Sequence, residues 1–170
     1  MFAAVEAGAT MVGFVFYGPS PRNLKIEFGA KLIRRVPATV EKVGLFVNPD
    51  NGLLSGVLDK AEFDFIQLHG DESPERVEEL KSLAGRPVIK ALKICRPEDL
   101  EVMEAYRSVV ERFLFDARVP EGIRNALPGG NALSFDWKIL AGQALEDPWM
   151  LAGGLTAENV ADAMRISGAD

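Results

Sequence analysis

The sequence is poor in the two residue types that most often bind metals or form cross-links. Its 170 residues include one cysteine, Cys95, and one histidine, His69. A single cysteine cannot close an intrachain disulfide, and cytoplasmic proteins usually have none. One cysteine and one histidine are also too few for a zinc cluster. We therefore expect a cytoplasmic protein without a metal site of the Cys/His kind.

Long apolar runs and dense positive charge are missing as well. The longest apolar runs, such as 11–16, have the length of a strand and cannot cross a membrane. The opening residues 1–6 lack a basic segment, so they do not predict a signal peptide. Lys and Arg number 19 against 25 Asp and Glu, which gives a formal net charge of -6. The densest basic cluster, 31–35, suits the end of a solvated helix, and we expect no nucleic-acid or membrane partner.

Apolar segments of two kinds alternate along the chain. We expect strands at 11–16, 42–47, 63–68, 87–94, 112–115 and 149–152. We expect helices at 1–9, 26–36, 52–60, 73–83, 96–110, 136–143 and 156–166. Ser73 and Thr156 are the expected N-caps of two of these helices. The strands are almost continuously apolar, as parallel strands covered on both faces are, so the alternation predicts an α/β fold with a parallel sheet.

Residue types at the strand ends favour a closed barrel over an open doubly wound sheet. No Gly-x-Gly-x-x-Gly turn follows the first strand, so a dinucleotide-binding sheet gains no support. Polar or small residues follow several strands instead: Asn48, His69, Asp116 and the pair Gly153–Gly154. Chemistry collected at the carboxyl ends of many strands is typical of the (β/α)8 TIM barrel. Six strands are too few for eight, so we expect a single, partial TIM-barrel domain over residues 1–170.

Two segments near strand ends hold side chains that can bind a ligand. Arg22 lies in the loop 18–23, which two prolines stiffen, and its guanidinium group matches the geometry of a carboxylate. The same composition also fits a solvated arginine in an inert loop. His69 ends the third expected strand, where it either touches a ligand or serves as a structural hydrogen-bonding group.

Three further segments leave two interpretations each. Asp116 follows an apolar strand, and burial favours the protonated carboxyl that a general acid needs, although an aspartate here equally fits a hydrogen bond with backbone N–H groups. Gly153–Gly154 either lets backbone amides approach a phosphate or forms a tight turn. The loop 127–131 is either a mobile lid or a turn.

Six motifs, taken in order, closely resemble the phosphoribosylanthranilate isomerase family. They are Gly13-Phe14-Val15-Phe16-Tyr17, Ser20-Pro21-Arg22-Asn23, Val43-Gly44-Leu45-Phe46-Val47-Asn48, Gln67-Leu68-His69-Gly70-Asp71-Glu72, Gly129-Gly130 followed by Phe135-Asp136-Trp137, and Leu151-Ala152-Gly153-Gly154-Leu155. Each motif alone is unspecific. The ordered set covers nearly the whole chain, and this order and spacing carry the resemblance.

The resemblance implies an enzyme of tryptophan biosynthesis that acts on a small phosphosugar. The reaction is the Amadori rearrangement of N-(5-phosphoribosyl)anthranilate to 1-(2-carboxyphenylamino)-1-deoxyribulose 5-phosphate, which needs an acid and a base but no metal or redox cofactor. On the family's pattern, Asp116 is the general acid and Arg22 binds the anthranilate carboxylate. Gly153 and Gly154 bind the phosphate. We also expect His69 to contact the substrate, because it lies at the carboxyl end of a strand.

The chain departs from the family in its catalytic base and at both ends. The family's base is a cysteine in a Lys-Ile-Cys-Gly motif on the first strand, which would lie before Met1. Residues 93–96 imitate this motif on a later strand but end in arginine, so we interpret Cys95 as structural. The eighth strand would follow Asp170. The resemblance thus implies a barrel with strands 2–7 present and strands 1 and 8 missing, and we expect little or no activity from these 170 residues alone.

Two other functions compete with this interpretation. The first is another phosphosugar-binding TIM-barrel enzyme, but a ribulose-phosphate epimerase needs metal ligands and an indole-glycerol-phosphate synthase needs a lysine/glutamate pair, and neither set is found. The second is a non-catalytic module made from a degenerate barrel, which the presence of both Asp116 and Arg22 disfavours. Fusion or association with indole-glycerol-phosphate synthase or tryptophan synthase stays open. Ala132 stands where the family usually has glycine, which predicts a stiffer loop.

Overall fold

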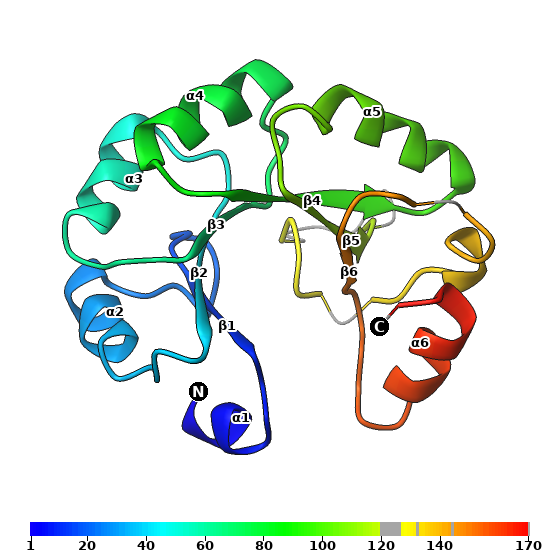
Figure 1. Cartoon of the computed structure of the whole chain (residues 1–170), viewed down its shortest axis with the longest axis horizontal. Helices are drawn as coiled ribbons and strands as arrows, with labels where there is room; N and C mark the ends of the chain where they lie inside the picture. Colours follow the sequence, from blue (N-terminus) through cyan, green and yellow to red (C-terminus); the bar gives the residue numbers. More distant parts are fainter. Residues whose placement is uncertain (120–126, 132, 144, 170) are drawn as a thin grey trace. The chain divides into compact units, whose positions relative to one another are not determined.

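A computed structural model describes residues 1–119, 127–131, 133–143 and 145–169 of the chain (Figure 1). The chain divides into two compact units, Met1–Val88 and Ile89–Asp170. Strands and helices alternate in each unit, and the strand pairs within each unit are parallel. This confirms the prediction of an α/β fold with parallel strands. Among the described residues, no helix is both long enough and apolar enough to cross a membrane.

The first unit is a parallel three-stranded sheet with its connecting helices. Its elements are α1 (Phe2–Glu6), β1 (Met11–Val15), α2 (Ile26–Ile33), β2 (Glu41–Phe46), α3 (Asn51–Leu58), β3 (Phe65–Leu68) and α4 (Pro74–Ala84). The strands lie in the order β1-β2-β3, and Gly44 of β2 is paired with Phe14 on one side and Ile66 on the other. Helices α3 and α4 lie side by side (Figure 1). The carboxyl ends of neighbouring strands therefore meet at one edge of this sheet.

Three phenylalanines form an aromatic cluster in the apolar core of the first unit. The ring of Phe16 stacks on Phe46 with centroids 5.7 Å apart and meets the edge of Phe63 at 5.9 Å. Gly44 lies against this cluster, because a Cβ added there would be 3.1 Å from the Phe46 ring and 3.2 Å from the Phe63 ring. Burial of each phenylalanine stabilises the unit by about 2 kcal/mol. This packing joins the end of β2 to the residue after β1 and to the segment that leads into β3.

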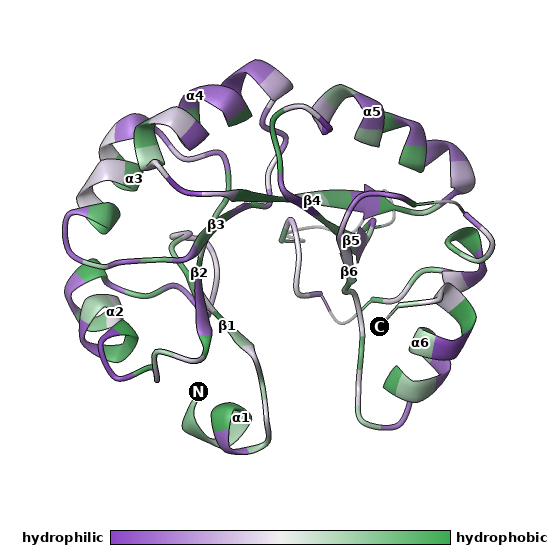
Figure 2. Cartoon of the chain, viewed as in Figure 1, coloured by the Kyte–Doolittle hydropathy of each residue, from purple (hydrophilic) through white to green (hydrophobic). Residues whose placement is uncertain are grey.

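Helix α4 follows the sequence prediction closely. The Ser73 hydroxyl accepts the N–H of Arg76 at 3.3 Å, and Pro74 occupies the first turn, where its missing N–H is harmless. Gly85 ends the helix with a φ of 58°, the left-handed conformation that favours glycine. Most of α4 is hydrophilic in Figure 2, and its buried side includes Val77 and Leu80. The prediction of Ser73 as an N-cap is confirmed.

The second unit has the same alternation but more irregular helices. Its elements are β4 (Val88–Ile94, beginning at the last residue of the first unit), the 3-10 helix η1 (Pro97–Val102), α5 (Met103–Tyr106), β5 (Arg112–Ala117), the 3-10 helix η2 (Trp137–Ile139), β6 (Trp149–Leu151) and α6 (Val160–Ser167). Strand β5 pairs with β4 and with β6, so that Lys93 lies opposite Asp116 and Leu151 lies opposite Phe115.

Two of the predicted helices are wrong in kind. The segment 96–110 forms η1 followed by the four-residue α5, and the Asp99 carboxylate accepts the backbone N–H groups of Cys95 and Arg96 just before η1. The segment 136–143 forms only η2. Gly142 has a φ of 72°, a value that a right-handed helix does not contain.

Two predicted boundaries are also wrong. Helix α6 begins at Val160 with Asn159 as its N-cap residue, and Thr156 instead opens a turn in which its N–H donates to Asn159 Oδ1 at 2.8 Å. Strand β5 extends through Asp116 to Ala117, so the aspartate lies inside the strand rather than after it. Its backbone is thereby fixed by the ladder to β4.

Candidate active site

Arg22 lies in a folded loop after β1. The Ser20 hydroxyl accepts the Arg22 N–H at 3.1 Å, and the Leu24 N–H donates to the Val15 carbonyl at 2.9 Å, so the loop is closed at its base and braced at its tip. The Arg22 side chain is exposed and makes no hydrogen bond or ion pair with the part of the chain that the structure describes. Its guanidinium group is therefore available to a ligand carboxylate.

His69 follows β3 and is buried, with 7% of its surface exposed. Its backbone N–H donates to the Phe46 carbonyl at 2.9 Å, which continues the ladder between β2 and β3 by one residue. Its ring nitrogen Nδ1 lies 2.9 Å from the side-chain amide nitrogen of Gln67, two residues earlier on the same face of the strand. His69 is thus held by a backbone hydrogen bond and by the contact of its ring with Gln67.

A buried glutamate that the sequence showed only as part of a motif ties the ends of β2 and β3 together. Glu72 is 3% exposed and accepts the backbone N–H of Asn48 at 2.8 Å. The N–H of Gly70 lies 3.1 Å from each of its carboxylate oxygens. Asn48 in turn has a φ of 44°, a left-handed conformation that asparagine tolerates, and accepts the N–H of Asp71 at 2.9 Å. These bonds fix the loop that carries His69.

Asp116 and Gly153 are brought into direct contact in the second unit. Asp116 is 6% exposed, and its Oδ1 accepts the N–H of Ala117 at 2.9 Å. A Cβ added to Gly153 would lie 2.9 Å from that same oxygen and 2.8 Å from the Ala117 nitrogen. Gly153 also has a φ of 88°, which favours glycine on its own. The bond from Ala117 lies within β5 and not in the loop that follows, and the role of Asp116 stays a prediction.

Gly154 has a structural reason to be glycine. Its φ is 60°, and an added Cβ would lie 2.8 Å from the Leu133 carbonyl carbon and 2.9 Å from the Ser134 nitrogen. The Asn159 side chain donates to the Gly154 carbonyl at 2.9 Å. The turn after β6 is therefore packed closely under residues 133–134. That its amides bind phosphate stays a prediction.

Asp99 is the second buried carboxylate whose role the sequence did not reveal. Its carboxylate accepts the N–H groups of Cys95 at 2.8 Å and Arg96 at 3.0 Å, and the Arg118 guanidinium donates to it at 2.6 Å. Burial alone would raise the pKa of Asp99, but the two backbone hydrogen bonds and the charges of Arg118 and Arg96 outweigh it and lower the pKa. Asp99 thus links the loop after β4 to the residue that follows β5.

The remaining predicted segments behave simply. Cys95 is exposed, and its backbone rather than its thiol makes the contact with Asp99. The loop 127–131 is closed as a turn by Asn131, whose amide group both accepts the Leu127 N–H at 3.1 Å and donates to the Leu127 carbonyl at 2.7 Å. The prediction made for Ala132 lies outside the described residues. Within those residues, no group of three or more His, Cys, Asp or Glu side chains is arranged to hold a metal ion.

The predicted site residues are divided between the units. Arg22 and His69 belong to the first unit, and Asp116, Gly153 and Gly154 belong to the second. The structure brings together Asp116 and Gly153, as their contact shows. The roles of the Glu72 and Asp99 carboxylates were not predicted, because the sequence does not show which backbone N–H groups lie beside them. For Asp99, the pattern Arg-Pro-Glu-Asp at the start of a helical segment was the available signal.

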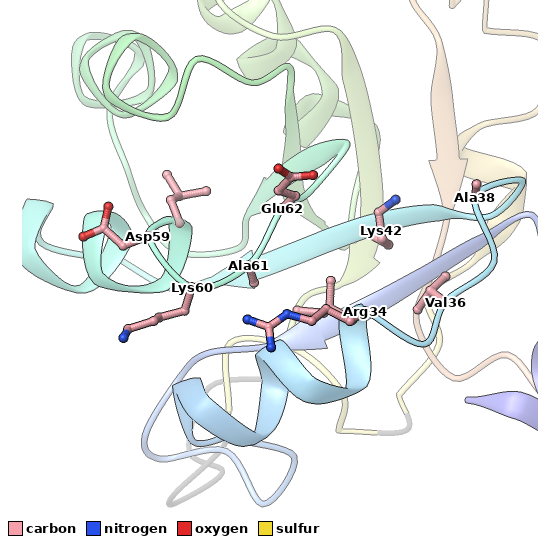
Figure 3. A pocket seen from close by; sticks show the side chains of 10 residues that line it. Arg34, Val36, Ala38, Lys42, Asp59, Lys60, Ala61 and Glu62 are labelled. Atoms are coloured by element: carbon pink, nitrogen blue, oxygen red, sulfur yellow. The ribbon is translucent and has the colours of Figure 1, made fainter.

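A pocket in the first unit contains none of these residues. It has a volume of about 550 Å³ and lies between the end of α2, the start of β2 and the connection from α3 to β3 (Figure 3). Cationic and anionic side chains both line it, namely Arg34, Lys42, Lys60, Asp59 and Glu62. The pocket lies at the amino ends of the strands, opposite to the carboxyl ends at which TIM-barrel active sites lie.

The whole chain matches the family model described as N-(5'phosphoribosyl)anthranilate (PRA) isomerase, over residues 1–170. It is 52% identical to the N-(5'-phosphoribosyl)anthranilate isomerase of Paramagnetospirillum magneticum over 169 residues, which cover 99% of this chain and 78% of the relative. It is 51% identical to the enzyme of the same name from Rhodospirillum centenum, with 98% of this chain and 78% of the relative covered.

Solved structures agree with these relatives. The phosphoribosyl anthranilate isomerase of Thermotoga maritima superposes with a TM-score of 0.83 at 30% identity and covers 98% of this chain and 77% of its own. A second structure of such an isomerase, in complex with reduced 1-(o-carboxyphenylamino)-1-deoxyribulose 5-phosphate, gives a TM-score of 0.76 at 27% identity over 98% of this chain and 76% of its own. The chain belongs to the N-(5'-phosphoribosyl)anthranilate isomerase family.

Proposed function

We propose that this protein is an N-(5'-phosphoribosyl)anthranilate isomerase of tryptophan biosynthesis. The observation that carries the proposal is the family match over residues 1–170, together with relatives about half identical along nearly the whole chain. The reaction moves a hydrogen from C2 to C1 of the aminosugar and opens its ring, so it is an isomerisation in which every atom is retained. The proposed setting is the cytoplasm, where the exposed Cys95 thiol stays reduced.

The finer fold that we propose is a TIM barrel in which this chain supplies strands 2–7 within a single domain of residues 1–170. The superposition on the Thermotoga maritima isomerase, which covers 98% of this chain and 77% of the other, supports this assignment. In such a barrel, the carboxyl ends of the strands converge on one site. His69 directly follows β3, Asp116 is the penultimate residue of β5, and Gly153 lies two residues after β6.

Asp116 is the proposed general acid. Its carboxyl is buried in β5, with Oδ1 bonded to the Ala117 N–H and packed against Gly153. It donates a proton to the ring oxygen, the C1–O bond opens, and the anthranilate nitrogen takes up the resulting positive charge as an iminium ion. Removal of the C2 proton then gives an enaminol. Its C1 takes up a proton and its C2 hydroxyl releases one, which gives the ketone. A base is needed to remove the C2 proton, and none of the five proposed site residues is assigned to it.

The other proposed residues bind the two anionic ends of the substrate. The exposed guanidinium of Arg22 fits the anthranilate carboxylate. The amides of Gly153 and Gly154, which follow β6 in left-handed conformations, fit the phosphate. His69 contacts the substrate at the end of β3. Reduced 1-(o-carboxyphenylamino)-1-deoxyribulose 5-phosphate, which is bound to the second related structure, presents both anionic groups.

The test replaces Asp116 in a chain that can turn over. The segments of the Paramagnetospirillum magneticum relative that lie outside the match are fused to this chain, and Asp116→Asn is compared with Asp162→Asn, an exposed aspartate of α6. Loss of one general acid lowers the turnover number by roughly 10²–10⁴-fold, whereas the control retains it. Equal turnover of the Asp116→Asn variant and its parent would exclude the proposed acid. Circular dichroism checks that both variants fold.

Binding is measured separately on the 170-residue chain. We expect this chain alone to show little or no isomerisation, so calorimetric titration with the reduced product analogue examines the binding groups without requiring turnover. Arg22→Met removes the guanidinium group but keeps much of the apolar stem, and it should weaken binding by roughly tenfold or more, since a hydrogen bond to a charged group contributes about 1.5–3 kcal/mol. Equal affinity of the Arg22→Met and wild-type chains would contradict the role of Arg22.

A further inference from the structure

Asp99 holds the guanidinium group of Arg118 by only one of its nitrogen atoms. Arg118 Nη2 lies 2.6 Å from Asp99 Oδ1 and 3.4 Å from the Lys93 carbonyl oxygen. The Asp99 carboxylate is buried, whereas 45% of the Arg118 side chain is exposed. No hydrogen bond or ion pair joins Nε or Nη1 to the part of the chain that the structure describes. The N–H donors on these two atoms are therefore available to a ligand.

Arg118 lies on the same face of the sheet as the proposed general acid. Its backbone N–H donates to the Ile94 carbonyl at 2.9 Å, which continues the ladder between β4 and β5 one residue beyond Ala117. Side chains two residues apart along a strand point to the same face, and this applies to Asp116 and Arg118. The acid and the cation are thus carried by the same strand end.

Asp116 has a different group on each of its two sides. Strand β5 pairs with β4 on one side and with β6 on the other. Gly153, which follows β6, lies against Asp116 Oδ1. The Arg118 guanidinium lies on the opposite side, because the groups that it contacts belong to β4 and to η1. A ligand protonated by Asp116 therefore has the glycine turn at one end and the guanidinium at the other.

The substrate of the proposed reaction carries its polar groups in the same order. Its phosphate is on C5, its ring oxygen joins C4 to C1, and its carboxylate is on the anthranilate ring that the nitrogen attaches to C1. With the phosphate at Gly153 and the ring oxygen at Asp116, the anthranilate extends toward β4. We propose that Arg118 binds the anthranilate carboxylate through the N–H donors that Asp99 leaves free, in addition to the contact made by Arg22. This inference rests on the proposed isomerase function and adds a specificity-determining residue to it.

The ion pair with Asp99 also stabilises the loop after β4. Asp99 accepts the backbone N–H groups of Cys95 and Arg96 in that loop, so removal of the Arg118 guanidinium loosens the loop whether or not a ligand is bound. A loosened loop weakens all ligands of the site alike. A lost contact to the carboxylate weakens only those ligands that carry the carboxylate, and this difference separates binding from a structural role.

The experiment compares two ligands that differ only in the carboxylate. One is reduced 1-(o-carboxyphenylamino)-1-deoxyribulose 5-phosphate, and the other is the same compound made from aniline in place of anthranilate. Calorimetric titration of the 170-residue chain with each ligand gives the ratio of their affinities. We expect the wild-type chain to prefer the ligand with the carboxylate. Arg118→Met should lower this ratio by roughly tenfold or more, the effect of one hydrogen bond to a charged group.

Two further variants serve as controls. Arg107→Met removes another guanidinium of the second unit, which pairs with Asp147 at 2.8 Å and Glu104 at 2.7 Å before β5 begins, and it should leave the ratio unchanged. Arg118→Lys keeps a cation for Asp99, but its single ammonium group is held there, so the ratio should fall although the fold is retained. Circular dichroism reports folding, and Arg118→Lys decides the question if Arg118→Met unfolds. An unchanged ratio in the folded Arg118 variants would overturn the proposal, even if both affinities fall.

The same titrations separate this inference from the proposed function. A wild-type chain that bound neither ligand, or both equally, would contradict the isomerase function and this inference with it. A wild-type preference for the carboxylate that persists in the Arg118 variants would refute the role of Arg118 alone. A preference that is lost in these variants and kept in Arg107→Met would support both.

Discussion

The two units close the ends of neighbouring strands with the same device, a buried carboxylate, but surround it differently. In the first unit, Glu72 accepts backbone N–H groups from Asn48 and Gly70. In the second unit, Asp99 accepts backbone N–H groups from Cys95 and Arg96 and also binds the Arg118 guanidinium at 2.6 Å. Both carboxylates satisfy loop N–H groups that would otherwise be unpaired at the mouth of a sheet.

The comparison extends to the glycine that lies beside each strand end. Gly70 is closed in by side-chain atoms of Asn48 and Glu72. Gly153 is closed in by the Ala117 backbone nitrogen and by Asp116 Oδ1, and its φ of 88° adds a conformational demand. Side chains can rotate away from an intruding atom, whereas a backbone in a ladder cannot. The second unit should therefore tolerate change beside its candidate catalytic residue less well than the first.

The largest effect is expected for Gly153→Ala. The new Cβ would lie 2.8 Å from the Ala117 nitrogen, and the residue must keep a φ of 88°, so we expect a loss of about 3 kcal/mol of unfolding free energy. Urea denaturation measures it. The control is Gly142→Ala, whose φ is 72° but whose Cβ would meet nothing within 4 Å, so that only about 1 kcal/mol of conformational strain applies. Equal losses in the two variants would show that crowding at Asp116 is unimportant.

Gly70→Ala should be less damaging, at about 2 kcal/mol, because its Cβ meets the side chains of Asn48 and Glu72. Asn48→Ala removes the nearest of these atoms at the expense of the hydrogen bond to the Asp71 N–H. A double-mutant cycle measured by urea denaturation should therefore give a combined loss smaller than the sum of the two single losses. Strict additivity would contradict the side-chain origin of the crowding.

Much of this arrangement could be read from the sequence, and the reasons for the exceptions are physical. Strand runs and the Ser73 cap depend on local apolar pattern and local hydrogen bonds, and they were predicted. The helix expected over 96–110 was wrong in kind, because apolar spacing does not distinguish a 3-10 helix from an α-helix. The start of α6 moved to Val160 because the side chain of Asn159 closes a turn with Thr156.

The candidate site could likewise be predicted only in part from the sequence. The position of Asp116 near a strand end could be predicted from the apolar run before it. Its contact with Gly153 could not, because the two residues are 37 positions apart in the sequence and come together only through the pairing of β5 with β6. The hydrogen bonds of Glu72 and Asp99 likewise join residues at the ends of neighbouring strands. Contacts of this kind are created by the register of the sheet, which no local pattern specifies.

The ion pair of Asp99 predicts a dependence on pH. The pKa of this carboxyl is lowered in the folded chain, so its stabilisation is fully present above the ordinary aspartate pKa of 3.8 and is lost as the pH falls through the lower folded value. Asp99→Asn should reduce the unfolding free energy at neutral pH by about 1–2 kcal/mol and flatten its decline at acid pH. Urea denaturation at a series of pH values measures this. An unchanged acid decline in the variant would contradict the assignment.

The smallest effect is expected at the surface of the first unit. Lys60 forms an ion pair with Glu27 at 3.6 Å, and both side chains are exposed. Lys60→Ala should change the unfolding free energy by less than about 0.5 kcal/mol, because solvent screens such a pair. A loss of unfolding free energy as large as that of Asp99→Asn would mean that exposed and buried carboxylates contribute equally to stability, contrary to the account.

A crystal structure of this chain with reduced 1-(o-carboxyphenylamino)-1-deoxyribulose 5-phosphate bound tests the central claim most directly. The account predicts one molecule of the analogue with its carboxylate on Arg22, its phosphate on the amides of Gly153 and Gly154, and oxygen atoms within hydrogen-bonding distance of His69 and Asp116. An analogue that binds elsewhere, or coordinates in which Arg22 and Asp116 open onto different surfaces without a shared cavity, would contradict it.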